Sequence, residues 1–379
     1  MKSPKLYLIV LIIGLVACKE RFTPETTLNN KNLLVVEGFI NVGADSTLIR
    51  LSRTVTLDNK KVANQEVGAT VTVETSTNET KVLVEVEKGL YATPFLNFGA
   101  NKKYRIKIRT KNGINYQSDF VDAKVSPQID AVDFKVNPEG LQLYINASDP
   151  TNSTHYYRWE YRETWIFYAK YYASAKWTGG PTAVYRDFDE SVYKCWANAN
   201  SSTIRLGSSV KLTADVIHMA PLTEIASTSE KLSDRYSILV KQYALTKEAY
   251  EFWDLLKKNT ESLGSIFDVL PSQLTGNIRN ISTPEEPVIG YISAGTVQTR
   301  RIFISKNQLP NWSPVYPYQC NSLDTVKLSE ERYVFTNPNY VPVNEATNDM
   351  GEVIGHLATT RACADCTVRG TTKRPDFWQ

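Results

Sequence analysis

Apolar and polar residues alternate with a period of two along much of the first third of the chain. The runs GATVTVET (68–75) and KVLVEV (81–86) alternate cleanly, and KKYRIKIRTKNGINYQSDF (102–120) holds two alternating arms around Asn112-Gly113. This spacing is typical of half-buried strands, and Asn-Gly supplies the positive φ angles of a type I′ hairpin turn. The pattern predicts a β-sandwich over residues 32–126, either immunoglobulin-like or transthyretin-like.

The alternation resumes after Pro127, which is taken as a domain boundary. In THYYRWEYRETW (154–165) polar residues occupy even positions, and the odd positions carry the aromatic residues Tyr157, Trp159, Tyr161 and Trp165. One aromatic face and one polar face predict a half-buried strand. Residues 127–379 are therefore expected to form a second, fibronectin-like sandwich, with an irregular tail rich in Pro and aromatic residues from about Lys306.

One segment changes to helical spacing, TKEAYEFWDLLKKNTES, and predicts a helix near 246–262. Thr246 is a suitable N-cap, Glu248 lies in the first turn and Lys258 near the last. Its apolar stripe comprises Ala249, Phe252 or Trp253, and Leu256. We expect the helix to pack on the sandwich. The predicted fold is mainly β, with two β-sandwich domains, one packed helix and an irregular C-terminal tail.

The N-terminus has the pattern of an export signal. A basic start is followed by an apolar run over 6–16, which is shorter than the ~20 residues of a membrane-spanning helix. A small residue and Cys18 come next. This order predicts a lipoprotein signal peptide over 1–17 and a lipid anchor on Cys18, followed by a polar tether over 18–31. The alternative is an ordinary secretory signal in which Cys18 is incidental.

Four further cysteines remain, and two of them form a C-x-x-C near the C-terminus. They are Cys195, Cys320, Cys363 and Cys366. An even number of cysteines in an exported chain predicts disulfides, with three possible pairings. A zinc site or redox-active thiols are less favoured alternatives. We favour a bond from Cys320 to one member of the C-terminal pair, because it would hold the irregular tail.

Charge and motifs give little sign of catalysis. The chain has 43 basic and 40 acidic side chains and no long run of one sign, which argues against nucleic acid and anionic membrane surfaces as partners. The histidines His155, His218 and His356 are widely spaced, and neither a G-x-S-x-G motif nor a P-loop occurs. We therefore predict a protein that is not an enzyme and needs no cofactor or metal.

One acidic cluster has a second interpretation. The run RDFDES places three carboxylates close together, those of Asp187, Asp189 and Glu190. Carboxylates bind Ca²⁺, but this spacing matches no standard loop, so a solvated turn is favoured.

An aromatic segment, WIFYAKYYASAKWTGGP (165–181), is the main candidate for contact with a ligand or partner. Its candidate residues are Trp165, Phe167, Tyr168, Tyr171, Tyr172 and Trp177. The strand alternation breaks after Trp165, and Tyr and Trp are enriched where proteins bind partners. The competing interpretation, slightly favoured, is burial in the core. A weaker candidate of the same kind contains Trp312, Tyr316 and Tyr318.

Several motifs occur together in a recognisable order. They include LLVVEGFI (33–40), the helix block RYSILVKQYALTKEAYEFWDLL (235–256), PVIGYISAG (287–295) and CADCTVRGTTKRPDFWQ (363–379). In these motifs the chain resembles a family of Bacteroidota outer-membrane lipoproteins catalogued as domain of unknown function 4249. The resemblance covers nearly the whole mature chain. It implies an outer-membrane lipoprotein, exposed at the cell surface, that is commonly encoded beside TonB-dependent receptors. It supplies no catalytic residues.

The resemblance leads to three hypotheses of different classes. The first is an accessory subunit that captures or gates substrate for a TonB-dependent transporter, with the bilayer contacted through the Cys18 anchor. The second is an adhesion or structural surface protein. The third is a hydrolase of a surface polymer. The surface-export signal is incomplete, because Glu20 is the only acid beside Cys18 and Arg21 follows it.

Overall fold

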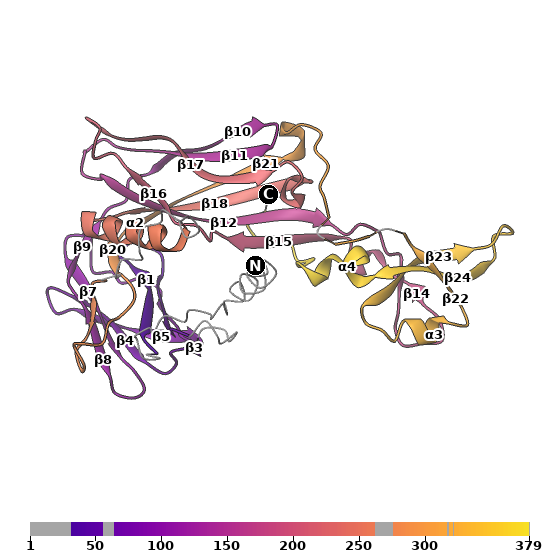
Figure 1. Cartoon of the computed structure of the whole chain (residues 1–379), viewed down its shortest axis with the longest axis horizontal. Coiled ribbons are helices and arrows are strands. Elements are labelled where there is room, and N and C mark those ends of the chain that lie inside the picture. Colours follow the sequence, from indigo (N-terminus) through magenta and orange to yellow (C-terminus); the bar gives the residue numbers. More distant parts are fainter. Residues whose placement is uncertain (1–31, 56–63, 262–275, 317, 321, 379) are drawn as a thin grey trace, which may run out of the picture.

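The chain folds into three units, as the computed structural model shows for residues 32–55, 64–261, 276–316, 318–320 and 322–378. Two β-sandwiches lie against each other, and a small lobe projects from one end of the second (Figure 1). The prediction of a mainly β fold with two sandwiches and one packed helix is confirmed. The arrangement of the later segments differs from expectation.

The N-terminal sandwich is built from one long, twisted sheet. Its strands are β1 (Leu34–Asn41), β2 (Thr47–Arg53), β3 (Asn64–Gln65), β4 (Thr70–Thr75), β5 (Thr80–Glu87), β6 (Leu90–Thr93), β7 (Lys103–Arg109), β8 (Asn115–Ser118), β9 (Val121–Lys124), β19 (Ile278–Asn280) and β20 (Ser293–Gly295). The path runs β19-β8-β7-β4-β5-β6-β2-β1-β20-β9, and β9 also pairs with β7. The alternating residues of β4 and β7 point their apolar side chains into one core, as predicted.

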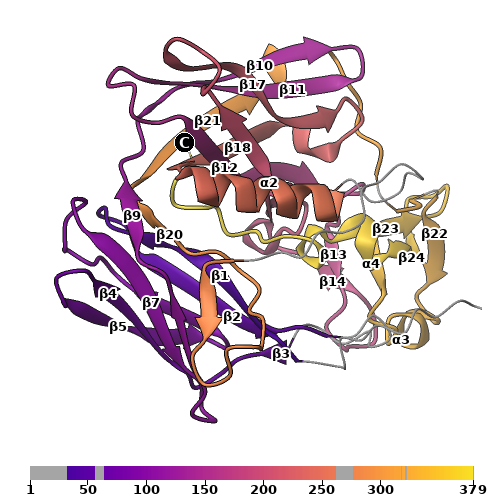
Figure 2. The same cartoon turned by 60° about the vertical axis from the view of Figure 1, so that its left-hand side comes forward.

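Two strands of this sandwich come from far along the chain, which corrects the expected domain boundaries. Strand β20 lies parallel between β1 and β9 (Figure 2), with Phe39 opposite Ser293 and Ala294 opposite Ala123. The Asn277 side chain bonds the backbone of Ile292 in both directions, at 2.8 and 2.9 Å. Residues 276–296 therefore belong to the first sandwich and not, as expected, to the second.

The 102–120 hairpin forms with a turn other than the predicted type I′. Gly113 has a φ of +83°, but Asn112 does not share a positive φ. Thr110 N–H donates to the Ile114 carbonyl at 3.0 Å, and Gly113 N–H donates to the Thr110 carbonyl at 2.9 Å. A three-residue loop with one left-handed glycine fits this pattern, because only the third loop residue then needs positive φ.

The second sandwich packs a three-stranded sheet on a five-stranded one. Its strands are β10 (Ile129–Asn137), β11 (Gly140–Asp149) and β17 (Asp215–Ala226), facing β12 (Tyr156–Tyr168), β15 (Lys194–Asn200), β16 (Arg205–Ser208), β18 (Arg235–Ala244) and β21 (Val297–Ser305). Leu141 and Leu143 of β11 meet Tyr157 and Trp159 of β12 in the core. The predicted aromatic face of β12 is thus its buried face.

Helix α2 (Lys247–Glu261) lies at the junction of the two sandwiches, close to its predicted bounds. The Thr246 hydroxyl accepts the Ala249 N–H at 3.2 Å, which satisfies a free donor at the helix start. Phe252 meets Tyr291 of the first sandwich at 5.3 Å between ring centroids, and Tyr250 meets Tyr156 of the second at 5.0 Å. The helix thus bridges both sandwiches.

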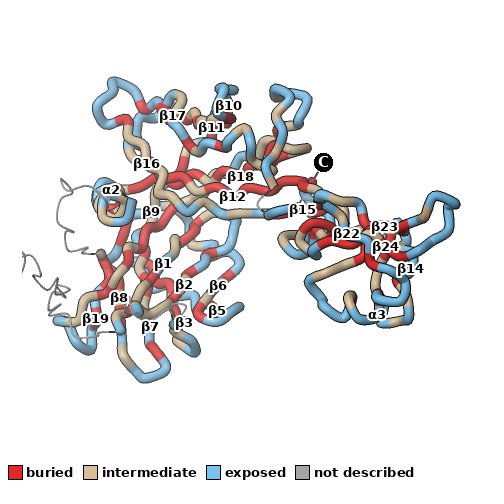
Figure 3. The backbone as a smooth tube through the Cα atoms, turned by 45° about the vertical axis from the view of Figure 1, so that its right-hand side comes forward, coloured by how far each residue is buried: buried red, intermediate tan, exposed pale blue. Residues whose placement is uncertain are grey.

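The projecting lobe replaces the expected irregular tail. It contains β13 (Ala175–Lys176), β14 (Val184–Tyr185), η1 (Phe188–Glu190), β22 (Asp324–Lys327), α3 (Glu331–Val334), β23 (Tyr340–Thr347), β24 (Val353–Thr360), α4 (Arg361–Ala364) and η4 (Cys366–Val368). Figure 3 shows buried residues in the lobe around β24. Its core includes Val326, Phe335 and Ala358, so the expectation of a segment without a core is wrong.

Two short 3-10 turns, η2 (Glu230–Leu232) and η3 (Lys306–Gln308), complete the elements. Beyond the lobe, the chain returns to the second sandwich and ends there. Thr371 and Trp196 exchange backbone hydrogen bonds at 2.8 and 3.0 Å. Trp378 is buried, with its ring 5.5 Å from that of Phe303.

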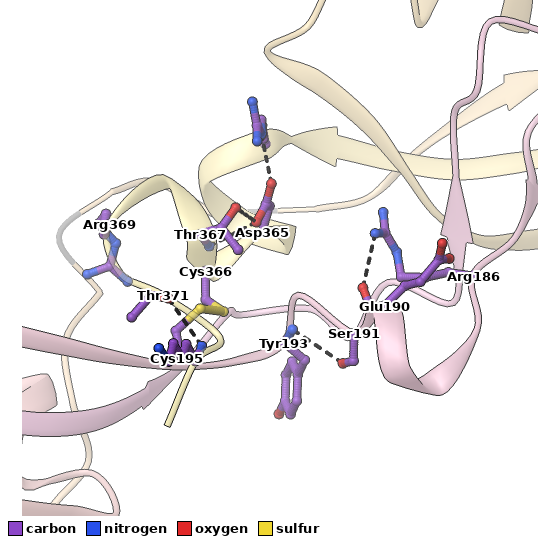
Figure 4. Close-up of a disulfide and its surroundings, with 12 residues drawn as sticks. Arg186, Glu190, Ser191, Tyr193, Cys195, Asp365, Cys366, Thr367, Arg369 and Thr371 are labelled. Atoms are coloured by element: carbon purple, nitrogen blue, oxygen red, sulfur yellow. Dashed lines mark hydrogen bonds and ion pairs between the residues drawn. A yellow bond between two sulfur atoms is a disulfide. The ribbon is translucent and has the colours of Figure 1, made fainter. Parts of the chain in front are cut away.

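Two disulfides fasten the lobe, so the predicted bridges are present. Cys195 of β15 is bonded to Cys366, and Cys320 is bonded to Cys363. The preference for Cys320 bonding one member of the C-terminal pair is confirmed. Figure 4 shows the Cys195–Cys366 bond beside Thr371, where the lobe leaves the sandwich. The C-x-x-C is therefore divided between two bridges.

Candidate binding cleft between the sandwiches

A cleft opens where the two sandwiches meet α2. It consists of two adjoining hollows of about 510 and 640 Å³. The residues common to both hollows are Glu37, Arg158, Glu160, Asn200, Lys241 and Trp253. Strands β1, β12 and β18 and helix α2 all contribute to its walls, so the cleft exists only when the two sandwiches are docked.

The floor of the cleft is the outer face of the five-stranded sheet. Alternation along β12 sends the aromatic residues inward, and it leaves Arg158, Glu160 and Arg162 on the outer face. The register then places Glu160 opposite Lys241 and Arg162 opposite Leu239. The polar positions predicted for 154–165 thus line the cleft, although the sequence did not indicate what they would face.

Arg158 is the fixed centre of this floor. The residue is only 9% exposed. Its guanidinium lies 4.2 Å from the Trp253 ring centroid and 4.6 Å from that of Tyr243. Nη1 is 2.9 Å from a Glu160 carboxylate oxygen, and the Tyr243 hydroxyl donates to the other oxygen at 2.8 Å. Stacking on two rings and pairing with a carboxylate hold the arginine rigidly.

Burial also keeps the Tyr243 hydroxyl protonated. Burial, with the negative charge of Glu160 as a further cause, raises the pKa of Tyr243 far above its usual range. The phenol therefore remains a hydrogen-bond donor at any physiological pH. Glu160 is engaged by two partners, which leaves it less able to neutralise other cations in the cleft.

Several polar groups in the cleft lack partners among the described residues. Within that part of the chain, the side chains of Arg162, Lys241 and Glu37 form no ion pair or hydrogen bond. Arg158 Nε and Thr203 Oγ1 are buried and have no hydrogen-bond partner in the same part. Unpartnered buried polar atoms cost free energy, and their position beside unpaired charges in a hollow marks the cleft as a candidate binding site.

The aromatic segment selected from the sequence does not form a projecting site. Trp165 and Phe167 lie on β12 and are buried in the core, at 8% and 1% exposure. This corrects their assignment as partner-contacting residues. The alternation breaks after Trp165 because both faces of β12 are buried near its C-terminal end. The start of the lobe and the C-terminal chain cover the outer face of the sheet there.

The remaining aromatic candidates mark the start of the lobe. Tyr168 donates a hydrogen bond to Asp234 at 2.5 Å, and Tyr171 packs beside the Cys320–Cys363 bridge. Trp177 meets Phe335 in the lobe core at 5.6 Å between centroids. Only Tyr172 of the six is exposed, at 43%. These residues join the lobe to the sandwich.

The second aromatic candidate likewise contacts the sandwich. Trp312 packs against the core of the second sandwich. The Tyr318 hydroxyl accepts a hydrogen bond from Arg369 at 2.8 Å, and its ring lies 5.9 Å from that of Tyr316.

The titratable residues singled out in the sequence lie outside the cleft. His155 pairs with buried Asp215 and His356 with buried Glu331, both at 2.6 Å. Glu190 pairs with Lys176. The remaining members of these sets, His218, Asp187 and Asp189, are exposed. The described residues include no group of three or more His, Cys, Asp or Glu placed to hold a metal ion.

Cys18, the signal peptide and the tether lie outside the described residues. In the part that is described, no helix is both long enough and apolar enough to cross a membrane.

Comparison with known proteins identifies the chain at the level of its sequence family. The model of a family described as a domain of unknown function, DUF4249, matches residues 19–301. No curated protein sequence matches the chain.

Three solved structures are similar only in part. A two-domain fibronectin type III segment of chicken tenascin is 11% identical, covers 55% of this chain and 90% of its own, and has a TM-score of 0.17. A mutant Salmonella alpha-2-macroglobulin is 9% identical, with coverages of 72% and 14% and a TM-score of 0.18. The chicken interferon gamma receptor alpha chain is 10% identical, with coverages of 55% and 87% and a TM-score of 0.14. Likenesses this low carry no functional conclusion.

Proposed function

The chain belongs to the DUF4249 family, and on this premise we propose that it is a non-enzymatic lipoprotein of the Bacteroidota outer membrane that captures substrate for a TonB-dependent transporter. The cleft between the sandwiches is the observation that carries the proposal. Unpaired Arg162, Lys241 and Glu37 line it, together with two buried polar atoms that have no partner in the described chain. A ligand that supplies these partners gains free energy on binding.

The N-terminal sequence supports the location. The apolar run followed by Cys18 matches a lipoprotein signal, and lipid attached to that thiol would tether the protein beside a transporter in the same membrane. Cys18→Ser should abolish incorporation of a metabolically supplied fatty-acid analogue. Undiminished label in the variant would show that the anchor has been assigned to the wrong residue.

Co-purification tests the partner. The tagged full-length chain, extracted from its native membrane in mild detergent, should enrich a TonB-dependent transporter over the same tag on an unrelated lipoprotein. Absence of any such transporter above that control contradicts the proposal.

The projecting lobe favours a second candidate function, adhesion to another surface. Its exposed large apolar side chains include Tyr185, Phe188, Tyr333 and Met350. Phe188 is 82% and Tyr333 is 90% exposed, and such side chains are available for contact with another surface. Phe188→Ser with Tyr333→Ser should weaken cell attachment if adhesion is the function. It should leave attachment unchanged if the protein serves only in uptake.

A further inference from the structure

We infer that the cleft binds a short acidic oligosaccharide, held by Arg162 and Lys241, which line it, and by Arg301, which lies beside the second hollow on the same outer face of the five-stranded sheet. The inference rests on the proposed capture function and specifies its substrate class. It follows from the charge balance of the cleft, the spacing of its cations and the neutral polar groups beside them.

The register brings the three cations onto one face of neighbouring strands. Arg162 of β12 is opposite Leu239 of β18, and Leu239 is opposite Arg301 of β21. Lys241 lies two residues along β18 from Leu239 and therefore points to the same side. Within the described chain, no carboxylate pairs with any of the three.

The nearby acids do not balance these charges. Glu160 faces Lys241 across the strands, but Arg158 and Tyr243 already occupy its two oxygens. Glu37 is the other carboxylate common to both hollows. The first hollow adds one acid and one base, Asp45 and Arg50, so the lining still holds more basic than acidic side chains, which favours an anionic ligand.

Arg301 is held in place beside a like charge. Its Nη1 donates to the Ser237 hydroxyl at 3.1 Å, and its guanidinium lies 3.5 Å from the Phe377 ring centroid. Burial, and secondarily the positive charge of Arg162, lower the pKa of Arg301. Two neighbouring guanidinium groups repel each other, and they gain free energy when anionic groups of a ligand bind beside them.

The spacing indicates a ligand with more than one anionic group. Neighbouring strands are about 4.8 Å apart, so Arg162 and Arg301 stand about 10 Å apart at the backbone, on either side of β18. A chain of sugar acids carries carboxylates at intervals and can reach both.

Neutral polar groups next to the cations suit a sugar better than an acidic peptide. Asn200, Ser202 and Thr203 line the second hollow, and amides and hydroxyls both donate and accept hydrogen bonds. Thr203 Oγ1 is buried with no partner in the described chain. Sugar hydroxyls, each of which both donates and accepts, match this edge of the cleft, whereas the side chains of an acidic peptide only accept and leave donation to its backbone N–H groups.

Calorimetry on the detergent-solubilised full chain tests the inference. Trigalacturonate should bind, maltotriose of the same length should not, and raising the salt from about 0.05 to about 0.3 M should weaken binding. Arg162→Gln with Lys241→Gln should weaken binding at least about tenfold. The matched control, Lys327→Gln with Arg332→Gln, removes two exposed cations of the distal lobe and should bind normally. Glu37→Gln should strengthen binding, because it removes an opposing charge.

Three results would overturn the inference. They are no binding of trigalacturonate, equal binding by the double variant, and tighter binding of tetraglutamate than of trigalacturonate. The outcome is separate from that of the capture proposal. If a transporter co-purifies with the chain while no acidic sugar binds, only the substrate class is wrong. If acidic sugar binds while no transporter co-purifies, only the transport role is wrong.

Discussion

Cys195 and Cys366 are joined by a disulfide across 171 residues of chain, which ties β15, an edge strand of the second sandwich, to the end of the lobe. We expect Cys195→Ala with Cys366→Ala to destabilise the protein by about 2–5 kcal/mol, because the bridge closes a long loop in the unfolded chain. Thermal unfolding under oxidising conditions measures the loss.

Peptide mapping without reduction provides the control on connectivity. It should recover Cys195 linked to Cys366 and Cys320 linked to Cys363. Recovery of a Cys363–Cys366 peptide, or of four free thiols, would contradict the assigned pairs.

Local patterns predicted the elements of this fold better than their pairing. Alternation along 103–109 and the Thr246 cap of α2 each identified an element, because both signals are local. Strand β20 has only three small residues and pairs with β1 across some 250 positions of sequence. Such a parallel, non-local pairing leaves no periodic signal, so the sequence did not reveal that 276–296 completes the first sandwich.

Phe167 and Tyr172 should respond very differently to truncation, although the sequence grouped them together. Phe167→Ala should cost about 3–5 kcal/mol, because the ring is 1% exposed and fills the core. Tyr172→Ala should cost about 1 kcal/mol or less, since the residue is 43% exposed and its ring meets that of Tyr193 edge-on, at 5.5 Å between centroids. Urea unfolding of the two single variants measures both values. Equal losses would show that Tyr172 is also a core residue.

Asp149 should make the second sandwich sensitive to acid. Burial opposes ionisation of its carboxylate, but hydrogen bonds from Thr151 at 2.6 and 2.9 Å and from Ser153 outweigh it and lower its pKa. A group with a lowered folded-state pKa stabilises the fold above its unfolded pKa of about 3.9, and this stability is lost as the pH falls.

The pH dependence of the unfolding free energy of Asp149→Asn is the measurement. The variant should be less stable than the wild type at neutral pH, and its stability should fall less below about pH 4. Asp130→Asn, which removes an exposed carboxylate of β10, is the matched control and should follow the wild-type curve. An unchanged acid profile in Asp149→Asn would rule out this carboxylate as a source of acid sensitivity.

The cleft, like strand β20, depends on contacts between distant segments that the sequence pattern does not reveal. The even positions of 154–165 were predicted to be polar and outward-facing, and Arg158, Glu160 and Arg162 are on that face. The cleft that they line is completed by Glu37 and Trp253, which come from the first sandwich and from the helix. A site assembled by docking of distant elements has no motif along the chain, whereas the cysteines were found because their chemistry is confined to one residue type.

Glu331 and His356 hold the lobe together. His356 Nδ1 lies 2.6 Å from Glu331 Oε1, the Ala183 N–H donates to Oε2 at 2.6 Å, and Glu331 is fully buried. Glu331→Ala leaves two buried groups without their partner, so we expect a loss of about 3–5 kcal/mol in the lobe. Glu331→Gln retains an acceptor and should lose less, about 1–2 kcal/mol.

Hydrogen exchange resolves this effect by region. In Glu331→Ala, protection should fall at Ala183 and along β24, while β12 of the second sandwich keeps its protection, because β12 is held by the separate core of that sandwich. Glu330→Ala removes the neighbouring exposed carboxylate and should stay within about 0.5 kcal/mol of wild type. Wild-type protection in Glu331→Ala would show that the buried pair does not stabilise the lobe. Loss of protection in β12 as well would show that the lobe and the sandwich unfold as one unit.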